Sequence, residues 1–184
     1  MQDKVTSRYS TLEYVKSYPV FTKDQCKQFI EIYDKDLTEA RSATPSGDKV
    51  VKNHRDCSLK IVKENRLMDD LLGECINMYR TSFKYLPGLK RVDSQFLRYN
   101  VGGKFNTHID HYNLEARTLS MSIILNDEYM GGNFQFWDNS GKTIIKSISP
   151  VAGDVILFPS NFLYPHSVAP ITMGTRYAIV NWYN

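Results

Sequence analysis

The chain has 184 residues and a formal net charge of +3, a length that favours a single domain with a buried core. Its 42% hydrophobic and 23% charged residues exclude an intrinsically disordered protein, and the basic bias is too weak to indicate nucleic-acid binding by itself. No window approaches the roughly 18 apolar residues of a membrane span, and the first residues lack the apolar core of a secretory signal.

Two helical patterns occupy the first half of the chain. Thr22 followed by Gln25 is a capping-box signature, which predicts a helix from that point to about Ala40. A second helix is predicted from about Glu64 to Tyr85, where a Pro-Gly pair follows. Its buried stripe is expected to consist of Leu67, Leu71, Cys75, Met78 and Tyr79.

The polar segment 43–56 between the helices is rich in turn formers, and we interpret it as a mobile loop that acts as a lid. Near the N-terminus, Tyr9, Tyr14 and Tyr18 are expected to belong to a strand that packs on a sheet.

The three cysteines, Cys26, Cys57 and Cys75, are far apart and form no CxxC pair. An odd number of dispersed cysteines is typical of reduced thiols, so we expect a cytoplasmic protein. Cys26 and Cys75 fall in helical patterns, where they are expected to be small core residues.

From Val92 onward the pattern changes to short runs rich in β-branched and aromatic residues, separated by glycine-containing turns. The runs are residues 93–100, 117–127, 132–137, 142–149, 153–159 and 175–183. Six strands at this spacing predict a sandwich or barrel, with a hairpin at the DNSG turn of residues 138–141. The sequence therefore predicts a β-barrel or jelly roll buttressed by N-terminal helices.

The stretch KFNTHIDHY, residues 104–112, places two histidines around one aspartate. In a strand, His108 and Asp110 would share one face while His111 faces the other. Alone, H-x-D is most often a polar surface feature. However, imidazole and carboxylate on one face supply two of the three ligands of a 2-His-1-carboxylate site for Fe(II). The third ligand would be His54, in the polar segment, or His166, on a late strand.

Arg176 follows ten residues after His166, inside an apolar strand. A buried guanidinium needs an anionic partner, because its charge cannot be neutralised in a protein. Taken alone, Arg176 would be a strand-end arginine that reaches water or a protein carboxylate. Beside a metal-binding histidine, a carboxylate co-substrate is the better partner, held through bidentate hydrogen bonds.

Residues 92–184 resemble, in continuous order, the catalytic core of the Fe(II)/2-oxoglutarate dioxygenases, and within them the prolyl 4-hydroxylase branch. The motifs that carry the resemblance are QFLRYNVGGKFNTHID, LSMSIILND, MGGNFQFW, GDVILFP and PHSVAPITMGTRYAIVNWY. The resemblance implies an α+β fold whose double-stranded β-helix (jelly-roll) core spans residues 91–184. Residues 1–90 would form the helical support and lid loop of the same domain, 1–184.

The resemblance implies that His108, Asp110 and His166 ligate Fe(II), and that Arg176 binds the distal carboxylate of 2-oxoglutarate. The other residues implied to bind the co-substrate or line its pocket are Tyr99, Val168, Val180 and Trp182, and Ser122 is a further candidate to bind the co-substrate. Arg117 matches an arginine near the substrate mouth of the oxygen-sensing prolyl hydroxylases, and is otherwise interpreted as a surface charge at a strand start. His111 is left over, and we expect it to face outward; the alternative is that it turns to contact a metal ligand or the substrate.

The chain departs from the well-known members of the family at three points. At Ile124 the oxygen-sensing enzymes have a tyrosine that helps hold 2-oxoglutarate, so that hydrogen bond is either missing or supplied by Ser120 or Ser122. Collagen-type enzymes usually have lysine at the position of Arg176. The carboxylate ligand Asp110 is present, which favours hydroxylation over halogenation.

The implied activity is hydroxylation of a C–H bond, coupled to conversion of 2-oxoglutarate and O2 into succinate and CO2, with ascorbate as a reductant. Prolyl 4-hydroxylation of a peptide or protein is the first interpretation, and Phe134, Val168 and Trp182 would keep the site dry. The alternatives are hydroxylation of another amino acid, oxidative nucleobase demethylation and an inert barrel that binds a small carboxylate. Nucleic acid is disfavoured, because no second arginine follows Arg176 and the chain is only mildly basic.

Overall fold

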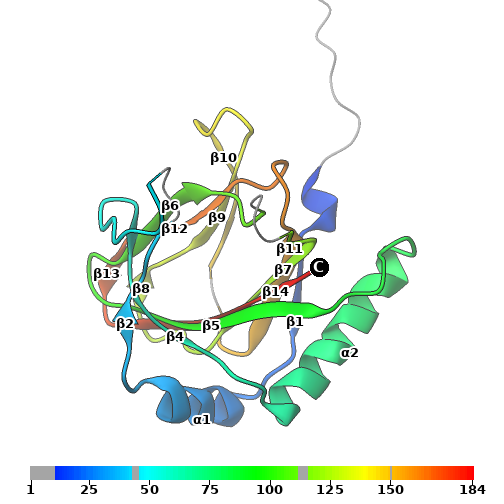
Figure 1. Cartoon of the computed structure of the whole chain (residues 1–184), viewed down its shortest axis with the longest axis horizontal. Coiled ribbons are helices and arrows are strands. Elements are labelled where there is room, and N and C mark those ends of the chain that lie inside the picture. Colours follow the sequence, from blue (N-terminus) through cyan, green and yellow to red (C-terminus); the bar gives the residue numbers. More distant parts are fainter. Residues whose placement is uncertain (1–10, 43–45, 112–115, 150) are drawn as a thin grey trace, which may run out of the picture.

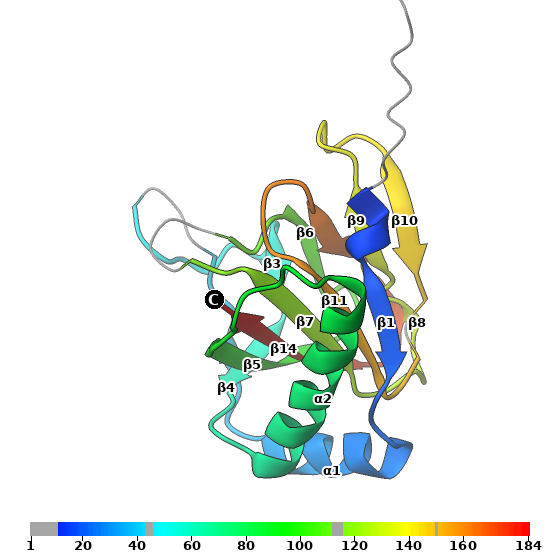
Figure 2. The ribbon, with the colours of Figure 1, turned by 90° about the vertical axis from the view of Figure 1, so that its right-hand side faces the viewer.

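The computed structural model describes residues 11–42, 46–111, 116–149 and 151–184. They form two antiparallel sheets whose facing sides enclose a core, with helices α1 (Lys23–Tyr33) and α2 (Arg66–Ser82) on the outer side of the larger sheet (Figure 1, Figure 2). This arrangement confirms the expected α+β jelly roll with supporting helices. Within the described ranges, neither helix is long and apolar enough to cross a bilayer.

The larger sheet has seven strands in the order β1–β11–β7–β14–β5–β4–β2. In chain order these strands are β1 (Lys16–Pro19), β2 (Thr38–Glu39), β4 (Ser58–Ile61), β5 (Arg91–Tyr99), β7 (Leu119–Ile124), β11 (Asp154–Pro159) and β14 (Arg176–Tyr183). The central strand β14 pairs with β5 on one side, which sets Arg176 opposite Tyr99. It pairs with β7 on the other side, which sets Val180 opposite Ser122.

The smaller sheet has five strands in the order β10–β9–β12–β6–β3. They are β3 (Arg55–Asp56), β6 (Lys104–His108), β9 (Phe134–Trp137), β10 (Ile144–Ile148) and β12 (His166–Val168). The predicted hairpin is confirmed, because β9 and β10 pair across the DNSG turn, where Gly141 has a φ of 68°. Two further strands, β8 (Met130–Gly131) and β13 (Ile171–Met173), form a separate ribbon.

Helix α1 begins as expected but ends early. The capping box is present, with the Thr22 hydroxyl accepting from the Gln25 amide N–H and the Gln25 side chain accepting from Thr22 N–H. The helix ends at Tyr33 rather than Ala40, so that prediction was wrong. Just after its end, Asp34 Oδ1 accepts a hydrogen bond from Arg98 Nη1 at 2.8 Å. Asp36 has a left-handed φ of 54°, which is incompatible with a continuing right-handed helix.

Helix α2 is three residues shorter at its C-terminal end than predicted, and it begins after the N-cap Asn65. Two residues of the predicted stripe, Cys75 and Tyr79, are buried as expected. Leu67 and Met78 are instead 45% and 41% exposed, so the prediction was wrong for them. The residues that are buried are Met68, Leu72, Cys75, Ile76 and Tyr79. This face packs against the larger sheet, and the Tyr79 hydroxyl also donates a hydrogen bond to the backbone carbonyl of Tyr14.

The first half is less helical than expected, because it contributes strands β1 to β4 as well. The N-terminal strand is present as β1, which includes Tyr18 and pairs with β11. Tyr14, expected in that strand, instead lies in a short 3-10 helix, η1 (Thr11–Tyr14), and Tyr9 lies outside the described residues. All three cysteines are free, as predicted, and Cys26 and Cys75 are buried in the core as expected. Cys57, for which no position was predicted, is buried too.

Strand β7 contributes residues to two hydrophobic clusters, one on each face of the larger sheet. All six of its residues are buried, so it shows none of the alternation typical of a sheet with one wet face. Leu119, Met121 and Ile123 belong to the cluster that packs against α1 and α2. Ile124 belongs to the second cluster, between the sheets, and Ser120 and Ser122 line a pocket there.

Candidate metal centre

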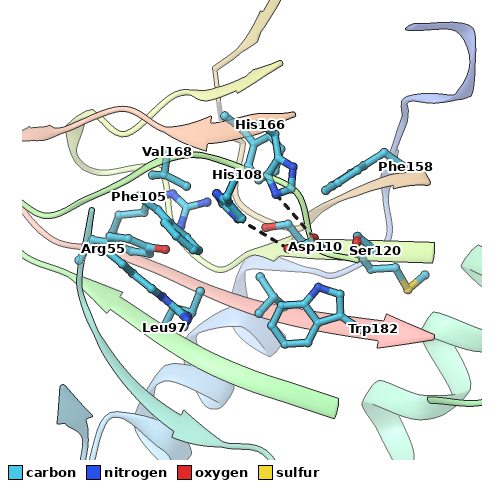
Figure 3. Close-up of a pocket in the computed structure, with 16 residues that line it drawn as sticks. Arg55, Leu97, Phe105, His108, Asp110, Ser120, Phe158, His166, Val168 and Trp182 are labelled. Atoms are coloured by element: carbon cyan, nitrogen blue, oxygen red, sulfur yellow. Dashed lines mark ion pairs between the residues drawn. The ribbon is translucent and has the colours of Figure 1, made fainter. Parts of the chain in front are cut away.

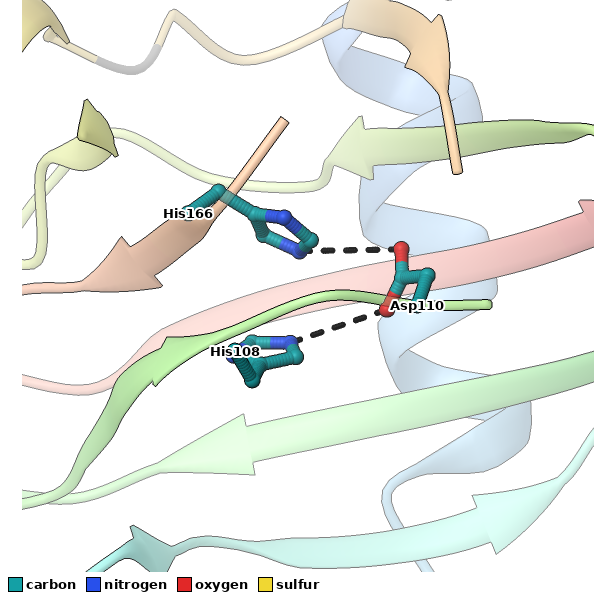
Figure 4. Close-up of side chains that lie close together, drawn as sticks. All are labelled: His108, Asp110 and His166. Atoms are coloured by element: carbon teal, nitrogen blue, oxygen red, sulfur yellow. Dashed lines mark ion pairs between the residues drawn. The ribbon is translucent and has the colours of Figure 1, made fainter. Parts of the chain in front are cut away.

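Two neighbouring strands of the smaller sheet bring the predicted ligands together. His108 is the last residue of β6 and His166 the first residue of β12, and the two strands pair with these residues directly opposite each other. Asp110, just beyond β6, closes the triangle, with Oδ1 3.6 Å from His108 Nε2 and Oδ2 3.6 Å from His166 Nε2 (Figure 4). One donor atom from each residue lies within 4.8 Å of the others.

Each imidazole is held in the tautomer that a metal ligand requires. His108 Nδ1 lies 2.8 Å from the carbonyl oxygen of Asn106, and His166 Nδ1 lies 3.0 Å from that of Tyr164. A carbonyl only accepts hydrogen bonds, so Nδ1 carries the proton in both rings and the lone pair is on Nε2. Both Nε2 atoms point toward Asp110, in the arrangement typical of metal-binding histidines.

Aromatic rings fix the orientation of the two imidazoles. Phe105 stacks on His108 with ring centroids 3.5 Å apart, and Phe134 stacks on His166 at 5.2 Å. Phe158 meets the His166 ring edge-on at 4.7 Å. These contacts limit ring rotation and keep water from one side of the site.

Burial sets the charge of the ligands. Desolvation and the neighbouring His108 lower the pKa of His166 to about 4, so this imidazole is neutral at pH 7. Burial alone would raise the pKa of Asp110, but His166, His108 and Ser120 together lower it well below its usual range. Two imidazoles and one carboxylate on one side of a cavity are the donor set of a facial Fe(II) site, and the residues therefore fit that metal.

The pocket beside the triad contains a buried cation with unused hydrogen-bond donors. Arg176 is 1% exposed, and its Nε and Nη2 have no hydrogen-bond partner among the described residues. Its guanidinium lies 5.3 Å from the centre of the Tyr99 ring. The hydroxyl of Ser122, which lines the same pocket, also lacks a partner in the described part of the chain. A buried guanidinium with two unused nitrogens, beside an unpaired hydroxyl, fits a small carboxylate.

A glycine makes room for this arginine. Gly132 has a φ of 65°, and a Cβ there would lie 2.5 Å from Ile171 Cδ1 and 2.8 Å from the Tyr129 ring. It would also lie 3.2 Å from Cδ of Arg176. A side chain at this position would therefore push against the wall that supports the guanidinium.

The structure gathers all but one of the predicted site residues around one pocket (Figure 3). The residues that line it with the triad include Tyr99, Ser120, Ser122, Phe134, Val168, Arg176, Val180 and Trp182. Arg117 lies outside this pocket but lines an adjoining cavity that also reaches His108 and Asp110. Its guanidinium stacks 3.9 Å from the Trp182 ring, and its Nη1 donates to the backbone carbonyl of Asp110 at 3.3 Å.

The two remaining histidines lie near the site but do not complete it. His54 packs its ring edge-on against Phe105, and its centroid is 6.5 Å from that of His108. His111 has its Nδ1 3.0 Å from the carbonyl oxygen of Arg117, so its ring braces the backbone next to Asp110. Of the two alternatives for the third ligand, the structure therefore selects His166.

Sequence reasoning missed Arg55, Leu97, Phe105 and Phe158, which also line the pocket. Arg55 reaches it because β3 pairs with β6, placing Arg55 opposite Phe105. This pairing joins segments about fifty positions apart and involves only two residues of β3. No local pattern in the sequence marks so short a strand.

Known proteins with similar sequences are Fe(II)-dependent oxygenases and hydroxylases, in agreement with the donor set of the site. The sequence model of the family described as 2OG-Fe(II) oxygenase superfamily matches residues 94–184. A PKHD-type hydroxylase of Delftia acidovorans is 34% identical over 128 residues, covering 64% of this chain and 52% of its own length. Human prolyl 3-hydroxylase 2 is 37% identical over 67 residues, covering 36% of this chain. The chain spans only 10% of the length of that human protein.

Among solved structures, a prolyl hydroxylase of Trichoplax adhaerens, in complex with a peptide fragment of the hypoxia inducible factor oxygen degradation domain, superposes with a TM-score of 0.72. The match covers 94% of this chain and 85% of that one at 20% sequence identity. At that identity the likeness concerns the fold alone.

Proposed function

The chain belongs to the 2OG-Fe(II) oxygenase superfamily, and from that premise we propose that it hydroxylates a prolyl residue of a peptide or protein. 2-Oxoglutarate and O2 would be converted to succinate and CO2, with ascorbate as a reductant. The observation that carries the proposal is one pocket that holds both the ligand triad and the buried Arg176, two of whose guanidinium nitrogens, Nε and Nη2, have no partner among the described residues.

The residues of this chain divide the work. His108, Asp110 and His166 hold Fe(II), which, together with 2-oxoglutarate, supplies the oxygen-activating chemistry needed to attack an unactivated C–H bond. Arg176 binds the distal carboxylate of the co-substrate, and the unpaired hydroxyl of Ser122 donates to the same carboxylate.

The walls of the pocket orient the co-substrate and exclude water. Tyr99, Val168 and Trp182 are 1%, 6% and 7% exposed, so they present a dry surface on the side of Arg176. Tyr99 lies under the guanidinium, where its ring supports the cation. Arg117, stacked on Trp182, lies where a peptide would enter, and we assign it to substrate contact.

The prolyl substrate is supported by the relatives, several of which carry prolyl hydroxylase in their names. One of them is a prolyl 3-hydroxylase, so the hydroxylated carbon has to be identified from the product rather than assumed to be C4. We also infer a reducing compartment, the cytoplasm, from the three free thiols of Cys26, Cys57 and Cys75.

The test is turnover with Fe(II), 2-oxoglutarate and ascorbate on peptides with a central proline, each matched to a copy with alanine there. We expect succinate release and a mass gain of one oxygen atom for the proline peptides only. The exposed Arg66→Gln variant is the control and should keep wild-type turnover. Succinate release with methylated single-stranded nucleic acid, and with none of the peptides, would instead establish a demethylase.

A further inference from the structure

A second buried arginine, Arg55, lies between the co-substrate pocket and the adjoining cavity. It lines both, and it is 9% exposed. Its guanidinium carbon lies 4.7 Å from the centre of the Phe105 ring, and that ring stacks on the ligand His108. Arg55 is therefore one aromatic ring away from the metal site, as Figure 3 shows.

No carboxylate of the described residues pairs with this cation. Nη1 donates to the backbone carbonyl of Arg41 at 3.3 Å, and Nη2 donates to Gln95 Oε1 at 3.1 Å. Both acceptors are neutral, and Asp93 is reached only through the amide of Gln95, whose Nε2 donates to it at 2.9 Å. Nε has no partner within the described ranges.

A buried guanidinium that stays charged and has only neutral partners is costly, since its desolvation is not offset by an opposite charge. The stack on Phe105 recovers part of that cost. The rest would be recovered by an anion from outside the chain. In the proposed reaction Arg176 would hold the distal carboxylate of 2-oxoglutarate and the ligand triad would hold the metal, so Arg55 is left for the substrate.

We propose that Arg55 binds a carboxylate of the substrate, so that the enzyme prefers an anionic substrate to its neutral counterpart. This inference rests on the proposed function and narrows its substrate class. The carboxylate can come from the C-terminal or free carboxyl of the proline itself, or from an acidic side chain next to it. The two sources share one chemistry, and the experiment separates them.

The experiment is calorimetric titration under nitrogen of protein loaded with Mn(II) and 2-oxoglutarate. One pair of probes is N-acetyl-L-proline and N-acetyl-L-prolinamide, which differ only in carboxylate against amide. The other pair is Ac-Glu-Pro-NH2 and Ac-Gln-Pro-NH2, which places the charge on the preceding side chain. We expect at least one of the two anions to bind about tenfold or more tightly than its neutral partner, an advantage that decreases with added salt.

The variants assign the preference to this residue. In Arg55→Gln the ratio of the two dissociation constants should fall to about one while the neutral probe binds as before. Arg55→Lys, which keeps the charge without the planar fork, should retain part of the preference and guards against loss of folding in the glutamine variant. Arg66→Gln, on the exposed face of α2, should leave the ratio unchanged.

Three results would overturn the inference. The first is equal binding of both members of each pair by the wild type, and the second is failure of both anions to bind while 2-oxoglutarate still binds. The third is loss of 2-oxoglutarate binding in Arg55→Gln, which would place Arg55 in the co-substrate site. Failure of the wild type to bind 2-oxoglutarate at all would instead remove the proposed function, and this inference with it.

Discussion

The two hydrophobic clusters of this protein lie on opposite faces of the same seven-stranded sheet, and they treat polar groups differently. On the helix side, the cluster of α1 and α2 contains apolar side chains, and the buried Tyr79 hydroxyl donates to a backbone carbonyl. On the inner side, Arg176, Ser122 and Arg55 keep donors without partners among the described residues. Two donors on the helix side also lack a partner there, the amide nitrogen of Asn181 and Nε of Arg98, although Arg98 Nη1 donates to the Asp34 carboxylate.

This contrast indicates that the helix-side cluster stabilises the fold, whereas the inner side of the sheet binds ligands. Buried polar groups in folded proteins are nearly always paired, so a cluster of unpaired donors beside a ligand triad indicates missing ligands rather than poor packing. Substitutions on the helix side should therefore reduce stability and leave ligand binding intact. Substitutions of the unpaired polar groups on the inner side should weaken ligand binding and leave the stability of the ligand-free protein intact.

The largest effect is expected for Arg176→Gln. Loss of the charged fork should raise the dissociation constant for 2-oxoglutarate by roughly 100-fold or more. The ligand-free protein should be no less stable, because it no longer buries an unpaired cation. Calorimetric binding and urea unfolding measure the two effects, with Arg176→Lys expected to bind at an intermediate strength. If Arg176→Gln were strongly destabilised but bound 2-oxoglutarate with normal affinity, Arg176 would be a structural residue and not a co-substrate ligand.

The matching change on the helix side is Leu72→Ala. Leu72 is 1% exposed, and removing its side chain should cost about 2–5 kcal/mol of unfolding free energy through lost burial and a cavity. Affinity for 2-oxoglutarate, measured below the unfolding transition, should stay within twofold of the wild type. A comparable loss of affinity would show that the two faces of the sheet are not independent.

The metal-free protein should be less stable at pH 5 than at pH 7. His166 has a folded-state pKa of about 4 against an ordinary value near 6.5, so the unfolded chain takes up a proton first as the pH falls. Stability is lost between these two values, by about 2 kcal/mol at pH 5. Urea unfolding at both pH values tests this, and His166→Asn should show a flatter dependence. Equal stability of the wild type at both values would contradict a neutral buried imidazole.

The smallest effect separates two serines on the same strand. Ser122→Ala should weaken 2-oxoglutarate binding about tenfold, since its hydroxyl is free to donate to a carboxylate. Ser120→Ala should change that affinity little, because the Ser120 hydroxyl is already bonded to Ser160 at 2.8 Å. A larger loss of 2-oxoglutarate affinity in Ser120→Ala than in Ser122→Ala would show that Ser120, and not Ser122, donates the hydrogen bond to the co-substrate.

The site residues that could be predicted from the sequence are those whose pattern lies within a few neighbouring positions. His108 and Asp110 are two positions apart, and Arg176 stands out as a lone cation in an apolar strand, so the sequence marks them as candidates. Only their combination in one chain, together with the family resemblance, points to a metal site. The choice of His166 over His54 depends on the register of β12 against β6, which joins residues far apart in the chain. Arg55 was missed because a strand of two residues leaves no periodic pattern.

The fold was predictable to a similar degree. Strand patterns after Val92 were clear because each is several residues long and bounded by turns. The stripe of α2 was placed only partly right because apolar residues cover a wide arc of the helix. The packing that selects the buried face joins the helix to strands far away in the chain. The lid role of segment 43–56 and the division into support and core remain predictions.

The central claim is that the triad and Arg176 form one site for Fe(II) and 2-oxoglutarate. Its most direct test is anaerobic titration of the apo-protein with both, monitored by the weak visible charge-transfer band of chelated 2-oxoglutarate. We expect a band in the wild type that is absent in His166→Ala, with both proteins folded by circular dichroism. A folded wild type that gives no band would contradict this claim and favour an inert carboxylate-binding barrel.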